Sequence, residues 1–149
     1  MKFLASLLVL ACMMAGTAAH ARSAASATEE AKAASIVEAT EAASTWLAYV
    51  DTKNYEESWN RTADIFKEAV TPEQWRAAVE PTREAVGPVV SRRLKSAQYF
   101  DSIPGAPEGE YVTVEFDTDF EKKPGSIERV TPKKAQDGTW KVSGYYLVK

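Results

Sequence analysis

The spacing of apolar residues changes once along this chain, at Gly87-Pro88, and this change limits the possible folds more than any other feature. Before it, apolar residues recur at steps of three and four, which is typical of helices. After it they alternate with polar residues, which is typical of strands. Helices followed by strands predict an α+β domain, with the helices packed on one side of an antiparallel sheet.

About three helices are expected before the change in period. The first begins near Thr28, and its apolar stripe is Ile36, Ala39, Ala43, Leu47 and Val50. The second follows an N-cap at Asn54, and its stripe is Tyr55, Trp59, Ala63, Phe66 and Val70. The third follows a cap at Thr71, with a proline in its first position. We expect Pro81 to kink or split this third helix, because proline removes a backbone donor.

About four strands are expected after Pro88, over residues 89–100, 111–120, 127–131 and 139–148. Pro124-Gly125 and Asp137-Gly138 predict turns. Alternation in the last strand places one set of residues on a single face: Trp140, Val142, Gly144, Tyr146 and Val148. The elements together predict a single cone-like α+β domain over residues 35–149, with the helices on a curved sheet.

The N-terminus predicts export. Lys2 is followed by an apolar run over residues 3–15, and Ala19-His20-Ala21 has the small-x-small pattern of a signal-peptidase site. The run is too short for a permanent membrane-spanning helix. We therefore expect residues 1–21 to be a cleaved signal peptide and residues 22–34 a flexible leader. The mature protein is then periplasmic or secreted.

An alternative for the N-terminus is lipidation at Cys12, because residues 9–12 loosely resemble a lipobox. Leu10 is a poor residue within such a motif, and the apolar stretch continues past the cysteine. Simple cleavage is the better interpretation.

Removal of the signal peptide changes the chemistry available to the chain. The only cysteine and the only histidine, Cys12 and His20, leave with it, and loss of Lys2 leaves 17 basic against 21 acidic residues in 128, a net charge of −4. Cysteine nucleophiles, Ser-His pairs and histidine metal sites are therefore excluded. We expect no catalytic residue, no metal, no cofactor, no transmembrane segment in the mature chain, and no nucleic-acid partner, because no basic stripe is present.

An acidic row, Glu115, Asp117 and Asp119, runs along the strand expected over residues 111–120. Residues two apart on a strand are separated by roughly 6.5–7 Å, whereas oxygen ligands lie about 2.3–2.6 Å from a calcium ion. The row therefore predicts a solvated face, paired across the sheet with Arg92, Arg93 or Arg129, and not a metal site.

Three groups of motifs carry a resemblance to a known family. They are Asp51-x-x-x-Tyr55-x-x-Ser58-Trp59, then Gly87-x-x-x-Ser91-Arg92, then Pro104-Gly105-Ala106-Pro107-x-Gly109-x-Tyr111 with Asp137-Gly138-x-Trp140-x-Val142-x-Gly144-Tyr145. Over roughly residues 35–149 the chain resembles the exported bacterial domain-of-unknown-function family 4019. Its order of elements is also similar to the nuclear-transport-factor-2-like and cystatin-like cone superfold. That architectural analogy implies no activity, and the family resemblance implies no catalytic residue.

The aromatic residues provide the clearest functional hypothesis, a non-catalytic binding or interaction module of the cell envelope. Aromatic side chains in a small domain usually form its core, but some can also line an apolar pocket. The candidate pocket residues are Tyr55, Trp59, Phe116, Trp140 and Tyr146. The partner would be a small apolar ligand or an envelope protein, and the sequence does not set the oligomeric state.

Two alternatives stay open. One is an isomerase- or dehydratase-type enzyme with an Asp base and a Tyr in the cavity, drawn from Asp51, Asp64 and Asp101 with Tyr55, Tyr145 and Tyr146. The other is a structural or regulatory envelope protein that acts through protein contacts alone. Lysine and arginine pairs at 92–93, 122–123 and 133–134 fit protected sheet edges better than an anionic-surface patch.

Overall fold

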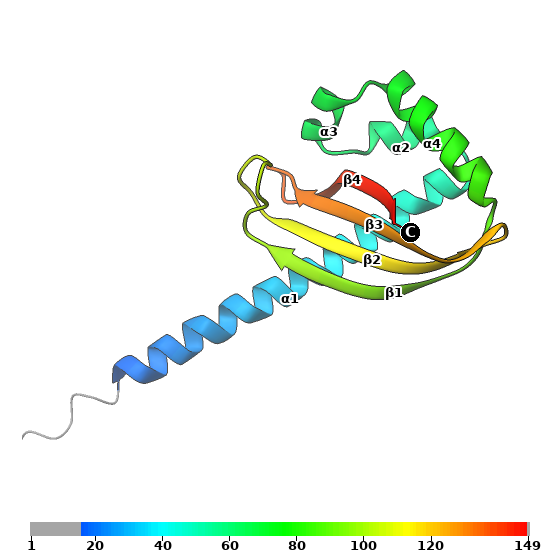
Figure 1. Ribbon diagram of the computed structural model, residues 1–149. Coiled ribbons are helices and arrows are strands. Elements are labelled where there is room, and N and C mark those ends of the chain that lie inside the picture. Colours follow the sequence, from blue (N-terminus) through cyan, green and yellow to red (C-terminus); the bar gives the residue numbers. More distant parts are fainter. Residues whose placement is uncertain (1–15, 149) are drawn as a thin grey trace, which may run out of the picture. The chain divides into compact units, whose positions relative to one another are not determined.

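The computed structural model describes residues 16–148, and within that range it contains four helices and four strands (Figure 1). The helices are α1 (Gly16–Asp51), α2 (Tyr55–Asn60), α3 (Asp64–Ala69) and α4 (Pro72–Val86). The strands are β1 (Val89–Phe100), β2 (Tyr111–Phe120), β3 (Lys123–Lys134) and β4 (Trp140–Val148). The predicted α+β class and the four-stranded antiparallel sheet are confirmed, but the helices number four and not three.

The chain divides between Ala33 and Ala34 into two units, and the buried core belongs to the second. Helix α1 begins well before Thr28, where the sequence predicts its start. Residues 1–15 of the expected signal peptide lie outside the described residues, and the boundaries at 21 and 34 stay predictions. Within residues 16–148, no helix is both long enough and apolar enough to span a bilayer.

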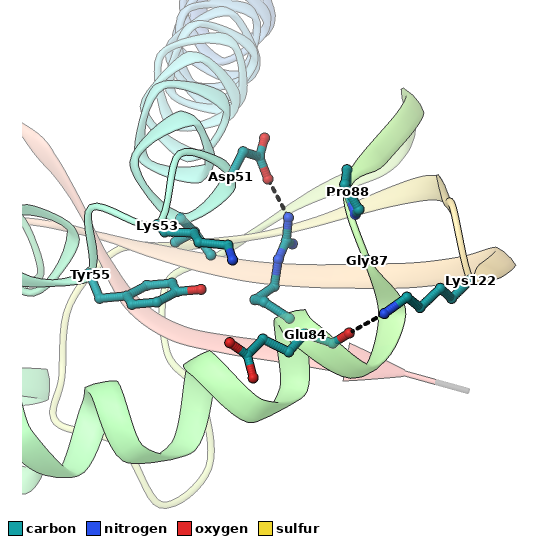
Figure 2. A pocket seen from close by; sticks show the side chains of 9 residues that line it. Asp51, Lys53, Tyr55, Glu84, Gly87, Pro88 and Lys122 are labelled. Atoms are coloured by element: carbon teal, nitrogen blue, oxygen red, sulfur yellow. Dashed lines mark hydrogen bonds and ion pairs between the residues drawn. The ribbon is translucent and has the colours of Figure 1, made fainter.

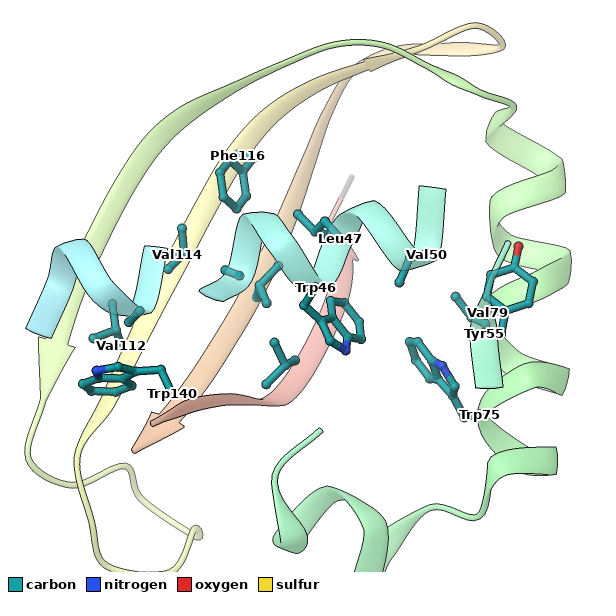
Figure 3. Close-up of a cluster of buried hydrophobic side chains, with 14 residues drawn as sticks. Trp46, Leu47, Val50, Tyr55, Trp75, Val79, Val112, Val114, Phe116 and Trp140 are labelled. Carbon is teal, nitrogen blue, oxygen red and sulfur yellow. The ribbon is translucent and has the colours of Figure 1, made fainter. Parts of the chain in front are cut away.

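The sheet is a simple meander in the order β1-β2-β3-β4, with every neighbouring pair antiparallel. It is curved, and the second half of α1 lies along its concave side (Figures 1 and 3). The predicted stripe of α1 is confirmed, since Ala39, Ala43, Leu47 and Val50 are at most 1 % exposed and Ile36 packs against them. They share one core with Val112, Val114 and Val130 of the sheet.

Aromatic rings fill the space between the helices and β4 (Figure 3). The ring of Trp46 lies 5.7 Å from Trp75 and 5.5 Å from Tyr145, measured between centroids. Buried Ser58 satisfies both indoles, because its carbonyl accepts from Trp46 and its hydroxyl accepts from Trp75. Such pairing is what buried tryptophan requires, and it fixes α2 against α1 and α4.

The second predicted helix is wrong as a continuous element. The chain leaves the helix after Asn60, and Thr62 forms a parallel bridge with Val142 of β4. The amide of Ala63 donates to the Val142 carbonyl at 2.8 Å before α3 begins. A tertiary backbone pairing has therefore replaced one helical turn, which the apolar spacing alone could not reveal. Asn54 does occupy the predicted N-cap position before α2, but its side chain makes no capping hydrogen bond.

Helix α4 follows its sequence signals more closely. The Thr71 hydroxyl accepts from the Gln74 amide, and the Gln74 side chain accepts from the Thr71 amide, which is the expected reciprocal capping box. Pro81 does not split the helix, which continues to Val86. Gly87 then ends it with a positive φ of 79°, a conformation that glycine adopts without strain.

Two features of the strands differ from the prediction. Strand β3 begins at Lys123, so the β2–β3 turn is at residues 121–122 and not at Pro124-Gly125. In β4, Thr131 pairs with Gly144 but Pro132 pairs with Val142, which leaves Ser143 as a bulge. A bulge reverses the alternation beyond it. The prediction that Tyr146 shares a face with Trp140 and Val142 is therefore wrong: Tyr145 faces the core, and Tyr146 is 65 % exposed.

The acidic row lies on the other face of the sheet, as predicted. Glu115 accepts from Arg129 at 2.7 Å, and Asp117 lies 3.4 Å from Arg93. Asp119 accepts from the hydroxyl of Ser91. The predicted partners Arg93 and Arg129 are confirmed, but Arg92 lies on the opposite face of β1 and pairs elsewhere.

Candidate functional site

Four charged side chains meet between the helices and the sheet, and we call them the ionic cluster: Asp51, Arg83, Arg92 and Glu128. They come from the last residue of α1, from α4, from β1 and from β3. Arg83 donates to Asp51 at 2.6 Å and to Glu128 at 2.8 Å. Arg92 donates to the same two carboxylates at 2.7 Å each. Two positive and two negative charges therefore balance, as buried charges require.

Glu128 is the centre of the cluster and is 0 % exposed. Its Oε1 accepts from Arg83 and from the hydroxyl of Tyr145, both at 2.8 Å. Its Oε2 accepts from Arg92 and from the hydroxyl of Thr118, both at 2.7 Å. A carboxylate has about four acceptor positions. All of them are occupied, so Glu128 has no free lone pair for a substrate proton.

The cluster raises the pKa of its member Arg92 and of Tyr145, which bonds to it. Burial lowers the pKa of Arg92, but its hydrogen bonds and charge pairing with Asp51 and Glu128 outweigh this and raise the pKa above its ordinary value. Burial raises the pKa of the Tyr145 hydroxyl, and the charge of Glu128 raises it further. Both groups therefore keep their protons at neutral pH and act as hydrogen-bond donors to the carboxylates.

A pocket of about 400 Å³ opens beside the ionic cluster (Figure 2). The end of α1, the start of α2, the last turn of α4 and the β2–β3 turn line it. Asp51 and Arg83 of the cluster form one part of its wall, and Lys53, Tyr55 and Lys122 form others. Since so many elements meet here, the side chains are held by the tertiary fold and not by one local segment.

Tyr55 has an uncommitted hydroxyl in this pocket. The residue is 3 % exposed, and its hydroxyl is the one buried side-chain polar atom without a hydrogen-bond partner among the described residues. Burial raises the pKa of Tyr55, partly opposed by the charge of Arg83. A buried hydroxyl without a partner costs free energy. It is therefore a feature that a ligand or a water molecule would relieve.

Of the five residues expected to line a pocket, Tyr55, Phe116 and Trp140 belong to one hydrophobic core cluster, and Trp59 packs against it. Tyr55 lines the pocket beside the ionic cluster, and Trp140 lines another one with Trp46 and Arg61. Phe116 is 4 % exposed within the core. Trp59 is half-buried and donates to the carbonyl of Val70, and Tyr146 points away from the core. Whether any of them binds a ligand stays a prediction.

The expected Asp-Tyr pairs are placed as follows. Asp51 belongs to the ionic cluster, and its side chain is 26 % exposed. Asp64 begins α3, and Asp101 follows β1 at the surface. The hydroxyl of Tyr145 does bond a buried carboxylate, but that carboxylate belongs to Glu128. Within residues 16–148, no three Asp, Glu, His or Cys side chains are placed to hold a metal ion.

Sequence reasoning missed Arg83 and Glu128, although the sequence carries a signal for each. Arg83 follows Val79 by four residues and precedes Val86 by three, so it lies on the apolar stripe of its helix. Glu128 lies two residues from Ser126 and from Val130, so it shares the buried face of β3 with them. Opposite charges on two faces that should be apolar predict a buried pair, since a buried charge needs a partner.

Comparison with known proteins gives one match. The family model described as "Protein of unknown function (DUF4019)" matches residues 42–145, which is more than half of the chain. This match confirms the resemblance carried by the sequence motifs. No curated protein and no solved structure matches the chain.

Proposed function

Because the chain belongs to the family described as "Protein of unknown function (DUF4019)", we propose its role from the site itself. It is a non-catalytic binding module of the cell envelope, exported through its N-terminal signal, that holds a small ligand in the pocket beside the ionic cluster. The curved sheet with the second half of α1 along its concave side supports a cone-like architecture of the nuclear-transport-factor-2-like kind, as an analogy of shape alone.

The observation that carries this proposal is the contrast between the ionic cluster and the pocket beside it. In the cluster, both carboxylates are held by arginines, and every acceptor position of Glu128 is used. In the pocket, the Tyr55 hydroxyl has no partner. A general base needs a free lone pair directed at a substrate, whereas a binding site needs a few uncommitted polar groups in a concave surface. This arrangement supports binding over catalysis.

The pocket lining favours a ligand that has polar groups as well as an apolar surface, in place of the purely apolar ligand suggested by aromatic content. The core absorbs most of the aromatic rings, including Trp46, Trp75 and Tyr145. Val50 and Pro88 are the apolar part of the pocket lining, and the rest of its side chains are charged or phenolic. A ligand of this pocket therefore combines an apolar surface with polar groups.

A thermal-shift screen of envelope metabolites and lipids against the purified protein tests this proposal. A ligand of the pocket raises the melting temperature of the wild type. The variant Glu84→Trp places a large ring at the rim of the pocket and should abolish the shift. Ala85→Trp adds the same ring on the exposed neighbouring position of α4, outside the pocket lining, and should retain it.

Two results contradict the binding proposal. One is a screen in which no compound raises the melting temperature of the wild type. The other is a set of hits that Glu84→Trp and Ala85→Trp affect equally. Recovery of one envelope protein by crosslinking in the native host, with no small-molecule hit, favours the alternative in which the chain acts through protein contacts.

A further inference from the structure

The rim of the pocket carries a lysine in a backbone conformation that lysine disfavours. Lys53 follows α1 with a φ of 60°, and it is the one non-glycine residue with a positive φ among residues 16–148. The left-handed region brings the Cβ of an L-residue close to the following carbonyl oxygen. Glycine ends most helices of this kind without that strain. A strained residue beside a pocket is a reason to look for a role of its side chain.

Three donor groups from different elements face the same pocket. Figure 2 shows the ammonium groups of Lys53 and Lys122 directed toward its middle from opposite sides, with the Tyr55 hydroxyl between the helices. Lys53 has no ion pair among the described residues. Lys122 donates only to a backbone carbonyl, that of Glu84, at 3.2 Å. Within residues 16–148, both ammonium groups are therefore without a carboxylate partner.

The charges around this pocket favour an anion. The ionic cluster is balanced within itself, so its members add no net charge. The remaining charged residues of the lining are Lys53 and Lys122, opposed by Glu84 alone. The chain as a whole has a net charge of −3. A local excess of positive charge on a negative protein attracts small anions to that place.

We propose that Lys53, Tyr55 and Lys122 form a binding site for the anionic oxygen group, carboxylate or phosphate, of a small molecule. The proposal rests on the binding function above and names its ligand chemistry. The two ammonium groups supply charge, and the Tyr55 hydroxyl donates a hydrogen bond, which charge makes stronger than a neutral one. When the ligand binds, the Lys122 ammonium gives up its hydrogen bond to the Glu84 carbonyl and donates to the ligand.

The Tyr55 hydroxyl defines the geometry of binding. Its oxygen is covered in this structure, so a ligand atom reaches it only when a side chain at the rim moves aside. The rim residues Lys53 and Glu84 are exposed and are free to change rotamer. Because burial raises the pKa of Tyr55, its hydroxyl keeps its proton at neutral pH and can donate to an anionic oxygen.

Calorimetric titration of the purified protein with inorganic phosphate and, separately, with succinate tests the site, with glycerol as the neutral control. We expect saturable binding of at least one anion and none of glycerol. Lys53→Gly and Tyr55→Phe should each weaken that binding by about tenfold or more. Lys53→Arg should retain it. Lys95→Gln removes the same charge from the opposite face of the sheet and should change it less than about twofold.

The melting temperature of the free protein shows whether a variant has lost only a ligand contact or has lost its fold. Lys53→Gly removes the left-handed strain and should raise the melting temperature of the free protein by about 2 °C. Glu84→Gln removes the opposing charge and should tighten anion binding. Absence of anion binding, or equal binding by wild type, Lys53→Gly and Tyr55→Phe, overturns the anion site. A thermal-shift ligand that Glu84→Trp blocks, but that Lys53→Gly does not weaken, overturns it while the binding function stands.

Discussion

At the scale of the residue, Glu128 explains how five other side chains are held in place. It lies in the core without exposure, and its two oxygens accept from Arg83, Arg92, Thr118 and Tyr145. Asp51 bridges the same two arginines. A buried ion pair contributes little net stability over an apolar core, but removing one partner leaves a charge without compensation. The cluster therefore specifies one arrangement of helices and strands.

Glu128→Gln tests this role. The amide has nearly the same shape but no charge, so the two arginines keep an unbalanced positive charge in the interior. We expect a loss of about 3–5 kcal/mol in the free energy of unfolding, measured by urea denaturation. Glu115→Gln removes a carboxylate from the solvated Glu115–Arg129 pair and should cost less than about 1 kcal/mol. Similar losses in both variants contradict a special role of the cluster.

The raised pKa of Tyr145 predicts how the unfolding free energy changes with pH in the alkaline range. Burial and the charge of Glu128 raise the pKa of its hydroxyl above the ordinary value of 10.0. A raised pKa means that the folded state holds the proton more tightly than the unfolded state. This contribution is therefore complete below pH 10.0 and is lost as the pH rises through the higher folded value.

Tyr145→Phe should accordingly flatten part of the fall in unfolding free energy at high pH, measured by urea denaturation at a series of pH values. It should also cost about 1–3 kcal/mol at neutral pH, since Glu128 loses a donor. The control Tyr146→Phe removes a hydroxyl from an exposed side chain of the same strand, and it should leave the profile unchanged. An identical alkaline profile for wild type and Tyr145→Phe would contradict the prediction.

At the scale of the element, the two predicted helix caps differ: the Thr71 side chain makes its capping hydrogen bond, and the Asn54 side chain makes none. The capping box at Thr71 predicts the start of α4 correctly, because both of its hydrogen bonds form within four residues of the chain. Asn54 has a similar sequence signal, but the chain leaves α1 through Lys53, whose φ is positive, and Asn54 follows at a φ of −84° and a ψ of 65°. Its side chain makes no hydrogen bond to the orphan amides of α2.

The two caps provide a matched pair of substitutions. Thr71→Ala should lower the unfolding free energy by about 1 kcal/mol, because an orphan amide of α4 loses its acceptor. Asn54→Ala should lower the unfolding free energy by less than about 0.5 kcal/mol, since no capping bond is lost. Thermal melting of both variants measures the difference. Equal costs would show that the Asn54 side chain caps α2 in solution.

At the scale of the whole molecule, the core lies within one of the two units. Every buried residue of the main hydrophobic cluster falls between Ala39 and Val142, and the partly buried residues packed against it fall between Ile36 and Tyr145. A chain that begins at Ala34 should therefore keep one cooperative unfolding transition, because it retains every side chain of that core. Calorimetry of the shortened and the full chain checks this. A broad transition without cooperativity in the shortened chain would show that the first unit is needed for folding.

The sequence by itself determined the class of the fold and most of its faces. The single change of apolar period separates helices from strands, and the stripe of α1 and the solvated acidic row follow from spacings of a few residues. Local signals of this kind act within one turn or one strand, so they do not depend on the rest of the molecule. The capping box of α4 and the turn at Asp137-Gly138 belong to the same group.

Only the tertiary structure decided the break at Thr62, the bulge at Ser143 and the site itself. The Thr62–Val142 bridge joins residues eighty positions apart, and the bulge places Tyr145 against Glu128 in place of Tyr146. The ionic cluster, its pocket and the other partners of Glu128, Thr118 and Tyr145, draw on all four strands and on three helices, so no local pattern contains them. A buried charge is stable only beside its partner, and the partner's position depends on long-range pairing of the chain.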